Sequence, residues 1–545
     1  MHNYKIDKNY AKPVAYFSME FGIHQPLKIY SGGLGFLAGS HMRSVYDLKQ
    51  NLVGVGILWK MGYYDQTRKE DGSLGTDFRI KYNNFLKDTG VKVKVPFMKK
   101  EITVKVWKLE SDTFETAPIL LMSTDTEEND DFQRAVTNKL YDDDKLTRLA
   151  QYMVLGIGGA KALEVLGFAP DIYHLNEAHP LPVGFWLLNK YKGDFAEVKK
   201  RLIFTTHTPE DAGNERNDFD LIKKTGFLCG VSPKTIAHIW KSKEKVFNHT
   251  LVALRMAKKS NAVSKIHGDV SREMWKDSKN ICEITHITNA QNKRFWADPI
   301  LEKALQSNDD ALFKQRKRAL KLALFQEVED QTGKVLDPDA LTIVWARRFA
   351  AYKRADLILT DIERFKKIAM NSERPVQVIW AGKPYPLHWE AIDVFNDIHK
   401  KTLNIPNCTI LIGYELRLSR LMKQGSDIWL NNPRYSREAS GTSGMTAAMN
   451  GCVNFSIADG WVPEFAKEGK NCFVIPHLDH NLPVEVQDEH DVEAMYDILE
   501  NKIVPLYYDK PEGWLKVVKQ SMIDVAPAFD SDRMADEYYT KLYNA

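Results

Sequence analysis

The sequence predicts an α/β protein with buried parallel sheets, because short apolar runs alternate with helical patterns along its length. The runs carry apolar side chains at successive positions, which is typical of strands that are covered on both faces. Helical patterns such as Leu146–Gly167 lie between them. Because strand and helix alternate in both halves, we expect a doubly wound sheet in each. The runs are Val14–Glu20, Asp171–Glu177, Arg201–Thr208, Glu283–Asn289, Leu341–Phe349, Val376–Gly382, Thr409–Tyr414 and Asp427–Asn432.

The chain length of 545 residues predicts two large domains, because a single hydrophobic core does not grow to this size. We place the boundary at Asp298–Pro299, after which a charged stretch without proline begins. The expected domains are residues 1–298, residues 299–512, and a C-terminal helical segment, 513–545, that packs back on the first domain. An insertion at Gly90–Thr124 alternates apolar and polar residues and therefore predicts antiparallel strands.

The composition excludes several classes of protein. Lys and Arg number 75 against 72 Asp and Glu, so a net charge of +3 gives no overall attraction to nucleic acid or acidic membranes. The N-terminal residues are polar, and no apolar run approaches the ~20 residues that span a bilayer. Five scattered cysteines without a CxxC pair indicate reduced, mostly buried thiols. We expect a cytoplasmic protein with no nucleic-acid or membrane partner.

Ligands of open α/β sheets bind beyond the carboxyl ends of the strands, so loops that directly follow strands are the candidate sites. Two such domains facing each other would form a cleft. The first candidate is the loop that contains Gly32, Gly33 and Gly35. Its glycines let the backbone approach a ligand, and a helix starting near Phe36 offers free amides to an anion. A glycine turn that only packs this helix on the sheet is equally compatible with the sequence.

The second candidate is a cluster of cations after the strand at Leu341–Phe349. Arg347 and Arg348 end the strand, and Lys353 and Arg354 follow after a short loop. Four cations are not buried together without an anion, because their repulsion in a low dielectric is large. The alternative is a surface cluster paired with Asp and Glu. We favour a phosphate site, because arginine forks and a lysine suit phosphate oxygens.

The third candidate is the stretch Arg437–Gly451. Glu438 precedes small residues that lead into a helix expected to begin around Thr442–Ser443. Hydroxyl caps and free helix amides would form a second anion site. An ordinary capped helix is the alternative. A carboxylate beside an anion site is favourable only when it accepts hydrogen bonds from a polyhydroxyl substrate, and sugars are such substrates.

Other polar groups follow strands at Asn176–His179, Thr206–Thr208 and Thr288–Asn289. The spacing of His179 and His207 does not match a zinc site, so we expect no metal. The chain also lacks a Gly-x-Ser-x-Gly elbow and a Cys/His nucleophile pattern.

Taken together, these motifs closely resemble the α-glucan phosphorylases (glycogen, starch and maltodextrin phosphorylases), particularly the short bacterial and archaeal type. The resemblance runs from Val14–Gly22 to about Trp461. It implies a GT-B fold, in which two Rossmann-like domains face each other across a cleft. It also implies a retaining hexosyltransferase that moves glucose from the non-reducing end of an α-1,4-glucan to inorganic phosphate, giving glucose 1-phosphate. Members of this family are commonly homodimers and use pyridoxal phosphate.

The resemblance also assigns roles by motif position. The residues implied to be catalytic are His207, whose main-chain carbonyl faces the anomeric carbon, Arg348, Lys353 and Glu438. Those implied to bind substrate are the phosphate loop Gly32 and Gly33, the polar loop residues Glu177 and His179, and Asn289, Ser440 and Gly441, which with Glu438 bind the glucose hydroxyls. Those implied to bind the cofactor are Arg347, Thr442, Ser443 and the position of Thr446.

Thr446 departs from the family pattern. The family motif continues into a Met-Lys pair whose lysine forms an imine with pyridoxal phosphate, whereas this chain has Met445-Thr446. A threonine hydroxyl forms no imine, so the cofactor is expected only in non-covalent form at this position. Two alternatives stay open, a glucosyltransferase that uses a nucleotide-sugar without pyridoxal phosphate, and a catalytically silent glucan-binding homologue. The retained cation cluster favours phosphorolysis, because buried cations without an anion are destabilising.

Overall fold

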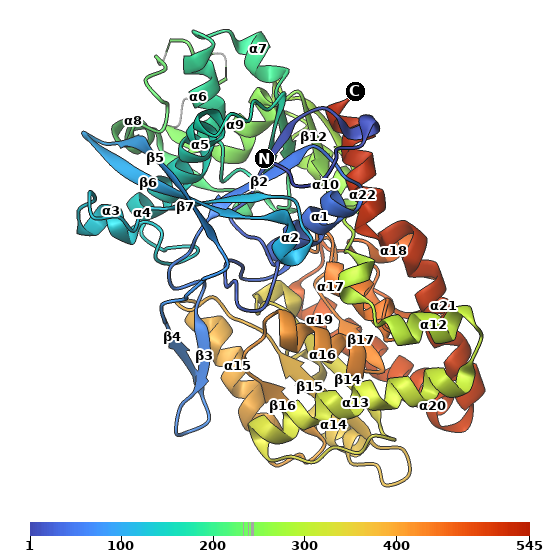
Figure 1. Ribbon diagram of the computed structural model, residues 1–545. Helices are drawn as coiled ribbons and strands as arrows, with labels where there is room; N and C mark the ends of the chain where they lie inside the picture. Colours follow the sequence, from blue (N-terminus) through green and yellow to red (C-terminus); the bar gives the residue numbers. More distant parts are fainter. Residues whose placement is uncertain (233, 238, 241–244) are drawn as a thin grey trace. The chain divides into compact units, whose positions relative to one another are not determined.

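The computed structural model describes residues 1–232, 234–237, 239–240 and 245–545. They form two compact units, and Figure 1 labels many of their elements. The first unit comprises Met1–Tyr63, Phe78–Asn289 and Ser531–Ala545, and the second comprises Tyr64–Asp77 and Ala290–Asp530. Residues 531–545 thus belong to the first unit, whereas 513–530 belong to the second. The domain borders expected from the sequence, 1–298, 299–512 and 513–545, stay a prediction.

The first unit contains a nine-stranded sheet in the order β13-β12-β9-β8-β1-β2-β7-β6-β5. The strands from β13 to β7 run parallel, and β7, β6 and β5 pair antiparallel. The antiparallel pairing confirms the prediction for the insertion. The strands are β1 Val14–Phe17, β2 Leu52–Ile57, β5 Lys87–Phe97, β6 Lys100–Leu109, β7 Ile119–Ser123, β8 Ile172–Asn176, β9 Leu202–Thr205, β12 Lys259–Ala262 and β13 Glu283–His286, with a separate pair, β10 Arg216–Asp218 and β11 Val246–Asn248.

The helices of the first unit follow the strands as the alternation predicts. The predicted helix at Leu146–Gly167 is confirmed, although a π-helical turn, η2 Val154–Gly158, separates α4 Lys145–Met153 from α5 Gly159–Val165. The remaining helices are α1 Gly33–Asp47, α2 Ser111–Phe114, α3 Asp131–Ala135, α6 Pro182–Lys190, α7 Phe195–Lys199, α8 Phe219–Thr225, α9 His249–Met256, α10 Lys265–Met274, α22 Ser531–Glu537 and the turns η1 Lys8–Tyr10, η3 Asp211–Gly213 and η7 Tyr538–Tyr543.

The second unit contains a six-stranded parallel sheet in the order β16-β15-β14-β17-β18-β19. The chain builds outward from β14 in one direction and then returns to add β17 beside it, so the strand order reverses between β14 and β17. Ligands of doubly wound sheets bind at such a reversal, beyond the carboxyl ends of the strands. The strands are β14 Leu341–Ala346, β15 Val376–Ala381, β16 Cys408–Leu411, β17 Ile428–Asn431, β18 Val453–Ile457 and β19 Cys472–Ile475.

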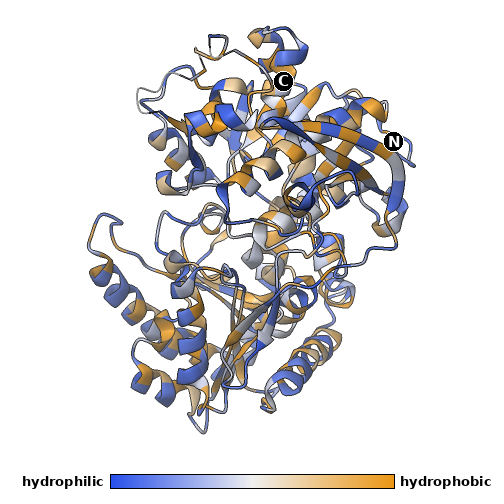
Figure 2. Ribbon diagram, turned by 90° about the vertical axis from the view of Figure 1, so that its left-hand side faces the viewer, coloured by the Kyte–Doolittle hydropathy of each residue, from blue (hydrophilic) through white to orange (hydrophobic). Residues whose placement is uncertain are grey.

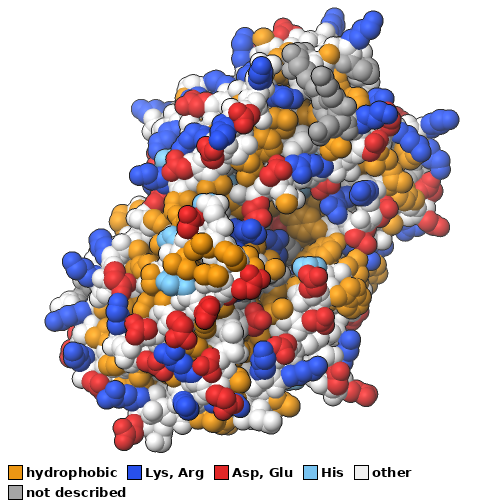
Figure 3. Space-filling model, turned by 180° about the vertical axis from the view of Figure 1, so that it is seen from behind, with side chains coloured by type: hydrophobic (Ala, Val, Ile, Leu, Met, Phe, Trp, Pro, Cys, Tyr) orange, Lys and Arg blue, Asp and Glu red, His pale blue; other side chains and the backbone are white. Residues whose placement is uncertain are grey.

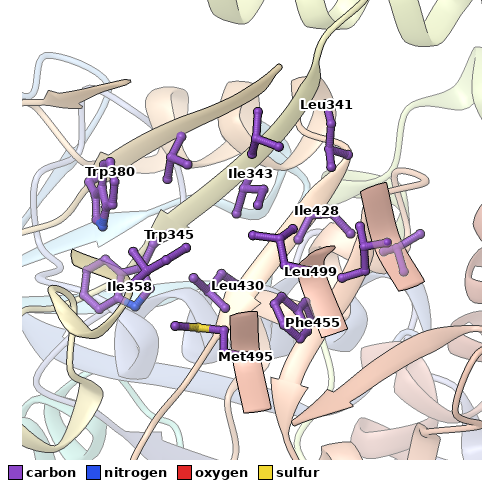
Figure 4. Close-up of a cluster of buried hydrophobic side chains, with 14 of the residues drawn as sticks. Leu341, Ile343, Trp345, Ile358, Trp380, Ile428, Leu430, Phe455, Met495 and Leu499 are labelled. Atoms are coloured by element: carbon purple, nitrogen blue, oxygen red, sulfur yellow. The ribbon is translucent and has the colours of Figure 1, made fainter. Parts of the chain in front are cut away.

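The sheet of the second unit is buried on both faces, as its apolar runs predict. Ile343 and Trp345 of β14 lie in the cluster drawn in Figure 4, while their neighbours Val344 and Ala346 belong to a separate cluster. Successive side chains of a strand point to opposite faces, so two apolar clusters require two layers of helices. Figure 2 shows that the helices carry both hydrophilic and hydrophobic residues, as covering helices do.

The helices of the second unit and one short hairpin complete it. The hairpin, β3 Asp65–Arg68 and β4 Leu74–Asp77, joins this unit through Gln66, whose side chain accepts from the amides of Gly413 and Tyr414. The helices are α11 Lys293–Trp296, α12 Pro299–Gln306, α13 Asp310–Thr332, α14 Ile362–Ala369, α15 Trp389–Thr402, α16 Leu416–Gly425, α17 Thr442–Ala448, α18 Val462–Phe465, α19 Val484–Ile498, α20 Val504–Asp509, α21 Pro511–Phe529 and the turns η4 Ala351–Lys353, η5 Leu357–Leu359 and η6 Leu499–Ile503.

The surface and the thiols agree with the composition. Acidic and basic side chains intermingle over the face shown in Figure 3. All five cysteines lie in the described ranges and are free thiols, four of them buried. Within those ranges, every helix is too short or too polar to span a bilayer.

Candidate active site

The centre of the candidate site in the second unit is the Glu438 carboxylate. Glu438 lies in the loop between β17 and α17 and is 8% exposed. Its Oε2 is 2.6 Å from Lys353 Nζ and 3.7 Å from an Arg347 guanidinium nitrogen. Arg347 follows β14 directly, and Lys353 ends the helical turn after it. The strand-order reversal makes β14 and β17 neighbours, and this brings the second and third sequence candidates together.

Arg347 is held at the end of β14 by the neighbouring strand. Its guanidinium donates to the Asn431 side chain and, over 3.2 Å, to the Leu430 carbonyl. Burial lowers the pKa of Arg347, and the nearby Glu438 carboxylate opposes this shift. The Nε of Arg347 is buried and has no hydrogen-bond partner in the protein. A rigid guanidinium with one unused donor is suited to bind an anion.

The two acidic side chains of this loop have opposite pKa shifts. Burial acts to raise the pKa of Glu438, but Lys353 and Arg347 outweigh it, so the pKa is lowered. Asp459, which follows β18, accepts from the amides of Glu438 over 2.9 Å and Gly460 over 2.8 Å. Burial is the main cause that raises the pKa of Asp459 to about 7. Glu438 is therefore the ionised carboxylate, and Asp459 positions its backbone.

The predicted helix after Glu438 begins at Thr442, as expected, but it lacks the predicted hydroxyl cap. Its N-cap is Gly441, with φ of +85° and no side-chain cap hydrogen bond. The left-handed conformation at Gly441 is one that glycine adopts without steric cost, and it turns the chain into the helix. The Oγ of Ser440 and the indole Nε1 of Trp461 are buried without a partner. The Trp461 indole lies near Glu438, because a Cβ added at Gly441 would be 3.5 Å from Glu438 Cγ and 3.7 Å from Trp461 Nε1. Ser440 is held at this loop by its carbonyl, which accepts from the Trp461 amide.

Thr446 is enclosed in α17. Its side chain is buried, and its hydroxyl donates to the Ser443 carbonyl over 2.9 Å. Ser443 in turn accepts from the Trp429 indole through its own hydroxyl, over 3.3 Å. The surroundings of Thr446 thus satisfy a hydroxyl, and no amine is available at this position.

The remaining two cations of the predicted cluster have different environments. Arg348 is exposed, although its charge contributes to lowering the pKa of Glu438. Arg354 is buried and forms ion pairs with Asp488, at 2.7 Å, and Asp491, at 2.8 Å. The argument that all four cations require a bound anion is therefore wrong for Arg354, because acidic residues of α19 pair with it. The two that remain beside Glu438 are Arg347 and Lys353.

In the first unit, the loops after β8 and β9 meet around Glu177. Its carboxylate accepts from the amides of His207, at 2.8 Å, and Ala178, at 3.0 Å, and from the hydroxyl of Thr208, at 3.2 Å. The donors are all neutral, so burial prevails and raises the pKa of Glu177. His207 also contacts Asn176 Oδ1 through Nε2, at 2.7 Å, and burial lowers its pKa to about 3. The imidazole of His207 is therefore neutral.

His179 and Asn289 also follow strands of this unit. Burial lowers the pKa of His179 to about 4, so its imidazole is neutral as well. The Nδ1 of His179 and the Oδ1 of Asn289 are buried without a hydrogen-bond partner. Such groups are expensive to leave unpaired, so they are candidates to bind a polar ligand. Among the described residues, His, Cys, Asp and Glu side chains do not gather in a group of three that could hold a metal ion.

The glycine loop of the first unit is held by Glu20, which we did not single out from the sequence. Glu20 accepts from the amides of Ser31, at 2.6 Å, and Gly32, at 3.2 Å, so these amides are not free for an anion. Helix α1 begins at Gly33 rather than near Phe36. A Cβ added at Gly32 or Gly33 would meet no atom within 4 Å, so these glycines border open space. Both Glu20 and Asp459 follow strands, and the strand-end rule could have found them.

The site thus combines a buried carboxylate held by two cations with unpaired buried donors, at the point where the strand order reverses. Comparison with protein families matches residues 249–496 to the carbohydrate phosphorylases. Glycogen phosphorylase of Aquifex aeolicus is 33% identical over 99% of this chain and 87% of its own length. Maltodextrin phosphorylase of Thermococcus litoralis is 32% identical over 98% of this chain and 71% of its own length. An uncharacterized protein of Methanocaldococcus jannaschii is 45% identical over 98% of this chain and its whole length.

The chain belongs to the carbohydrate phosphorylase family, as its motifs predicted. This membership supports an α/β fold of the glycosyltransferase type and a phosphorylase-type transfer of a hexosyl group.

Proposed function

We propose that this protein is an α-glucan phosphorylase-type retaining glucosyltransferase with the GT-B-type fold that its family implies. It would move glucose from the non-reducing end of an α-1,4-glucan to inorganic phosphate and release glucose 1-phosphate. The observation that carries the proposal is the Glu438 carboxylate, kept ionised by Lys353 and Arg347. It lies beside donors that the protein itself leaves without partners.

Glu438 would accept hydrogen bonds from hydroxyl groups of the bound glucose, with Ser440 and Gly441 beside it. An ionised acceptor forms stronger hydrogen bonds than a neutral one, so the two cations improve sugar binding by keeping Glu438 charged. From the first unit, we propose that Asn289 and His179 bind further hydroxyls and that the His207 carbonyl faces the anomeric carbon. The glycine loop at Gly32 and Gly33 would lie against phosphate.

The cations have a second task in this proposal. Lys353 and Arg348 would hold the substrate phosphate, and the Nε of Arg347 would bind a phosphate oxygen. Positive groups that are already fixed in place stabilise negative charge in the transition state without reorganising, which is worth about 3 kcal/mol for one donor. Exclusion of water from the site would prevent hydrolysis of the glucosyl group.

The residues present fit the phosphate of pyridoxal phosphate, the cofactor typical of the family, but not an imine at Thr446. Arg347 has a buried donor without a partner, and Thr442 and Ser443 form the first turn of α17. These residues would hold the cofactor phosphate, and Thr446 supplies only a hydroxyl that is already used. When bound, the cofactor supplies a second phosphate that exchanges a proton with the substrate phosphate.

Release of glucose 1-phosphate from maltoheptaose and phosphate, with and without pyridoxal phosphate, tests the proposal. We expect product with the cofactor, and at least about a hundredfold lower kcat/KM after Glu438→Gln. A matched control is Lys321→Met, which breaks the buried pair between Lys321 and Asp427 at 2.6 Å, outside the site. The control is expected to lose stability but to keep the kcat of the folded enzyme.

The threonine at position 446 also suggests a second candidate function, transfer of glucose from a nucleotide-sugar, which the same experiment can test. Because no amine is available there, the phosphates of a nucleotide-sugar could take the place of the cofactor phosphate. Chain extension of maltoheptaose from a nucleotide-glucose, without glucose 1-phosphate under any condition, would replace phosphorolysis by this activity. Binding of the glucan with neither activity would leave a catalytically silent glucan-binding protein.

A further inference from the structure

The hairpin formed by β3 and β4 is a part of the second unit that the proposed function does not use. The chain leaves the first unit after Tyr63 and returns to it at Phe78, so the hairpin is inserted between two segments of that unit. The hairpin lies beside α15 (Figure 1), where the Leu74 amide donates to the Asn396 side chain over 2.9 Å. Several of its other contacts reach the loops that follow β15 and β16.

Gln66 of β3 connects these two loops. Its side chain is 8% exposed, and its Nε2 donates to the Gly382 carbonyl over 2.8 Å. Its Oε1 accepts from the amides of Gly413, over 2.9 Å, and Tyr414, over 3.2 Å. A single side-chain amide thus satisfies three backbone groups of two different loops. Because backbone groups away from water are costly to leave unpaired, the loss of Gln66 would loosen both loops.

Both loops contact the backbone that carries Arg347. Gly382 lies directly against the Arg347 carbonyl, because a Cβ added at Gly382 would be 1.8 Å from this oxygen. The Tyr414 hydroxyl donates to the Ala346 carbonyl over 3.1 Å. Gln66 therefore acts on the end of β14 through two separate contacts.

This backbone aims the guanidinium of Arg347. The two terminal nitrogens donate to Asn431 and to the Leu430 carbonyl, whereas Nε is buried and has no partner in the protein. Nε is the guanidinium nitrogen closest to the backbone along the side chain, so a shift of the Arg347 backbone moves it directly. A hydrogen bond weakens steeply when its donor is misaligned. The unused donor therefore serves an anion only while this backbone is held in place.

We propose that Gln66 is a positioning residue of the anion site. By holding the loops after β15 and β16, it fixes the backbone of Arg347 so that Nε is aligned with a phosphate oxygen. Gln66 acts through these loops, because they use both its oxygen and its amide nitrogen. The inference rests on the proposed function, which assigns a phosphate oxygen to Arg347. The hairpin thus serves ligand binding as well as the stability of the second unit.

Calorimetric titration of the full-length protein with inorganic phosphate tests the proposal without requiring catalysis. Gln66→Met keeps the length of the side chain and removes all three hydrogen bonds. We expect it to weaken phosphate binding at least about tenfold, the cost of one misaligned hydrogen bond to a charged group. Binding of maltoheptaose should change much less, because Glu438 keeps Lys353 as its nearest partner. Unchanged phosphate affinity in folded Gln66→Met would overturn the proposal, as would a lack of phosphate binding by the unchanged protein.

A matched control separates positioning from support of the hairpin as a whole. Asn396→Ala removes the acceptor of the Leu74 amide on the other strand of the same hairpin. It should lower the stability of the protein and leave the phosphate affinity of the folded protein unchanged. A loss of phosphate affinity as large as that of Gln66→Met would overturn the proposal, because any loosening of the hairpin would then have the same effect.

Gln66→Glu is a milder variant that decides if Gln66→Met does not fold. It keeps the acceptor for Gly413 and Tyr414 but turns a carboxylate oxygen toward the Gly382 carbonyl. Phosphate affinity should fall at neutral pH. Relative to the unchanged protein at the same pH, it should recover in acid, because a protonated glutamate donates to this carbonyl again. A phosphate affinity equal to that of the unchanged protein at every pH would overturn the proposal.

The same samples separate this inference from the proposed function. Phosphate binding that weakens in Gln66→Met, with no glucose 1-phosphate from the unchanged protein under any condition, would keep the role of Gln66 and overturn the phosphorylase activity. Glucose 1-phosphate from the unchanged protein, with equal phosphate affinity in Gln66→Met, would keep the activity and overturn the inference.

Discussion

Glu438 in the second unit and Glu177 in the first are both glutamates in loops that follow strands. The protein compensates the cost of burying these two carboxylates in different ways. Lys353 and Arg347 are the partners of Glu438, whereas Glu177 accepts only from two backbone amides and a hydroxyl. Burial is the largest influence on the pKa of each carboxyl. Nevertheless, the pKa of Glu438 is lowered and that of Glu177 is raised.

The comparison shows that nearby full charges lower the pKa of a buried carboxyl in this protein, whereas neutral donors do not offset the effect of burial. The pH dependence of stability has opposite signs at the two positions. The stability from Glu438, whose folded-state pKa is lowered, is present above the unfolded pKa and is lost as pH falls. The stability from Glu177, whose folded-state pKa is raised, is present at low pH and is lost as pH rises. The surroundings of Glu438 therefore favour the ionised carboxylate, whereas those of Glu177 favour the protonated carboxyl.

The largest expected effect comes from removing Lys353, the cation nearest to the Glu438 carboxylate. Lys353→Met should lower the free energy of unfolding by about 4 kcal/mol, because Glu438 then loses its 2.6 Å partner while it stays buried. Urea unfolding of Lys353→Met, Glu438→Gln and the double variant measures this. The double variant should regain part of the loss, because the Glu438 charge is then no longer buried without Lys353, while Arg347 keeps its bonds to Asn431 and Leu430. Additive losses in the double variant would mean that the two side chains are not coupled.

A second prediction concerns Asp459. It lies near Glu438, but, like Glu177, it accepts hydrogen bonds from neutral backbone amides. Its pKa is raised from 3.8 to about 7, so the folded state binds a proton that the unfolded state releases between these values. Stability should therefore fall as pH rises through this window, by roughly 4 kcal/mol in total. Asp459→Asn should remove that part of the pH dependence. Unfolding free energies of both proteins between pH 4 and pH 8 test it, and equal slopes would contradict it.

A smaller effect is expected at Glu177. Glu177→Gln removes the charge but keeps one oxygen as an acceptor, so one of the present donors loses its partner. We expect a loss of about 1 kcal/mol at neutral pH, well below that of Lys353→Met. The same urea titration measures it. A loss as large as that of Lys353→Met would show that a charged partner, and not the neutral donors, compensates the burial of Glu177.

The smallest effect is expected at Thr446. Thr446→Val keeps the shape of the side chain and removes the hydroxyl that donates to the Ser443 carbonyl. Hydrogen bonds of this kind within a helix add little stability, so we expect a change of about 0.5 kcal/mol. Thermal unfolding is the readout. A loss several times larger would mean that the hydroxyl does more than form this hydrogen bond.

Much of the local structure could be predicted from the sequence. Each apolar run, from Val14–Glu20 to Asp427–Asn432, coincides with a strand or overlaps one, because strand burial leaves a clear local pattern. The helix after Glu438 was also placed correctly. Its hydroxyl cap was not, because several small polar residues in a row offer equivalent caps, and the left-handed Gly441 decides among them. The roles of the site residues stay predictions.

The sequence by itself determined which loops carry polar groups, that the chain alternates strand and helix, and that position 446 provides no amine. Only the tertiary structure decided which of these groups meet. Lys353 and Glu438 are 85 residues apart, and they pair because the strand order places β14 beside β17. Arg354 lies next to Lys353 in the chain but pairs with α19 instead. Local patterns encode burial and turns, whereas strand order depends on packing between distant segments, so the partners of a buried charge appear only in the folded chain.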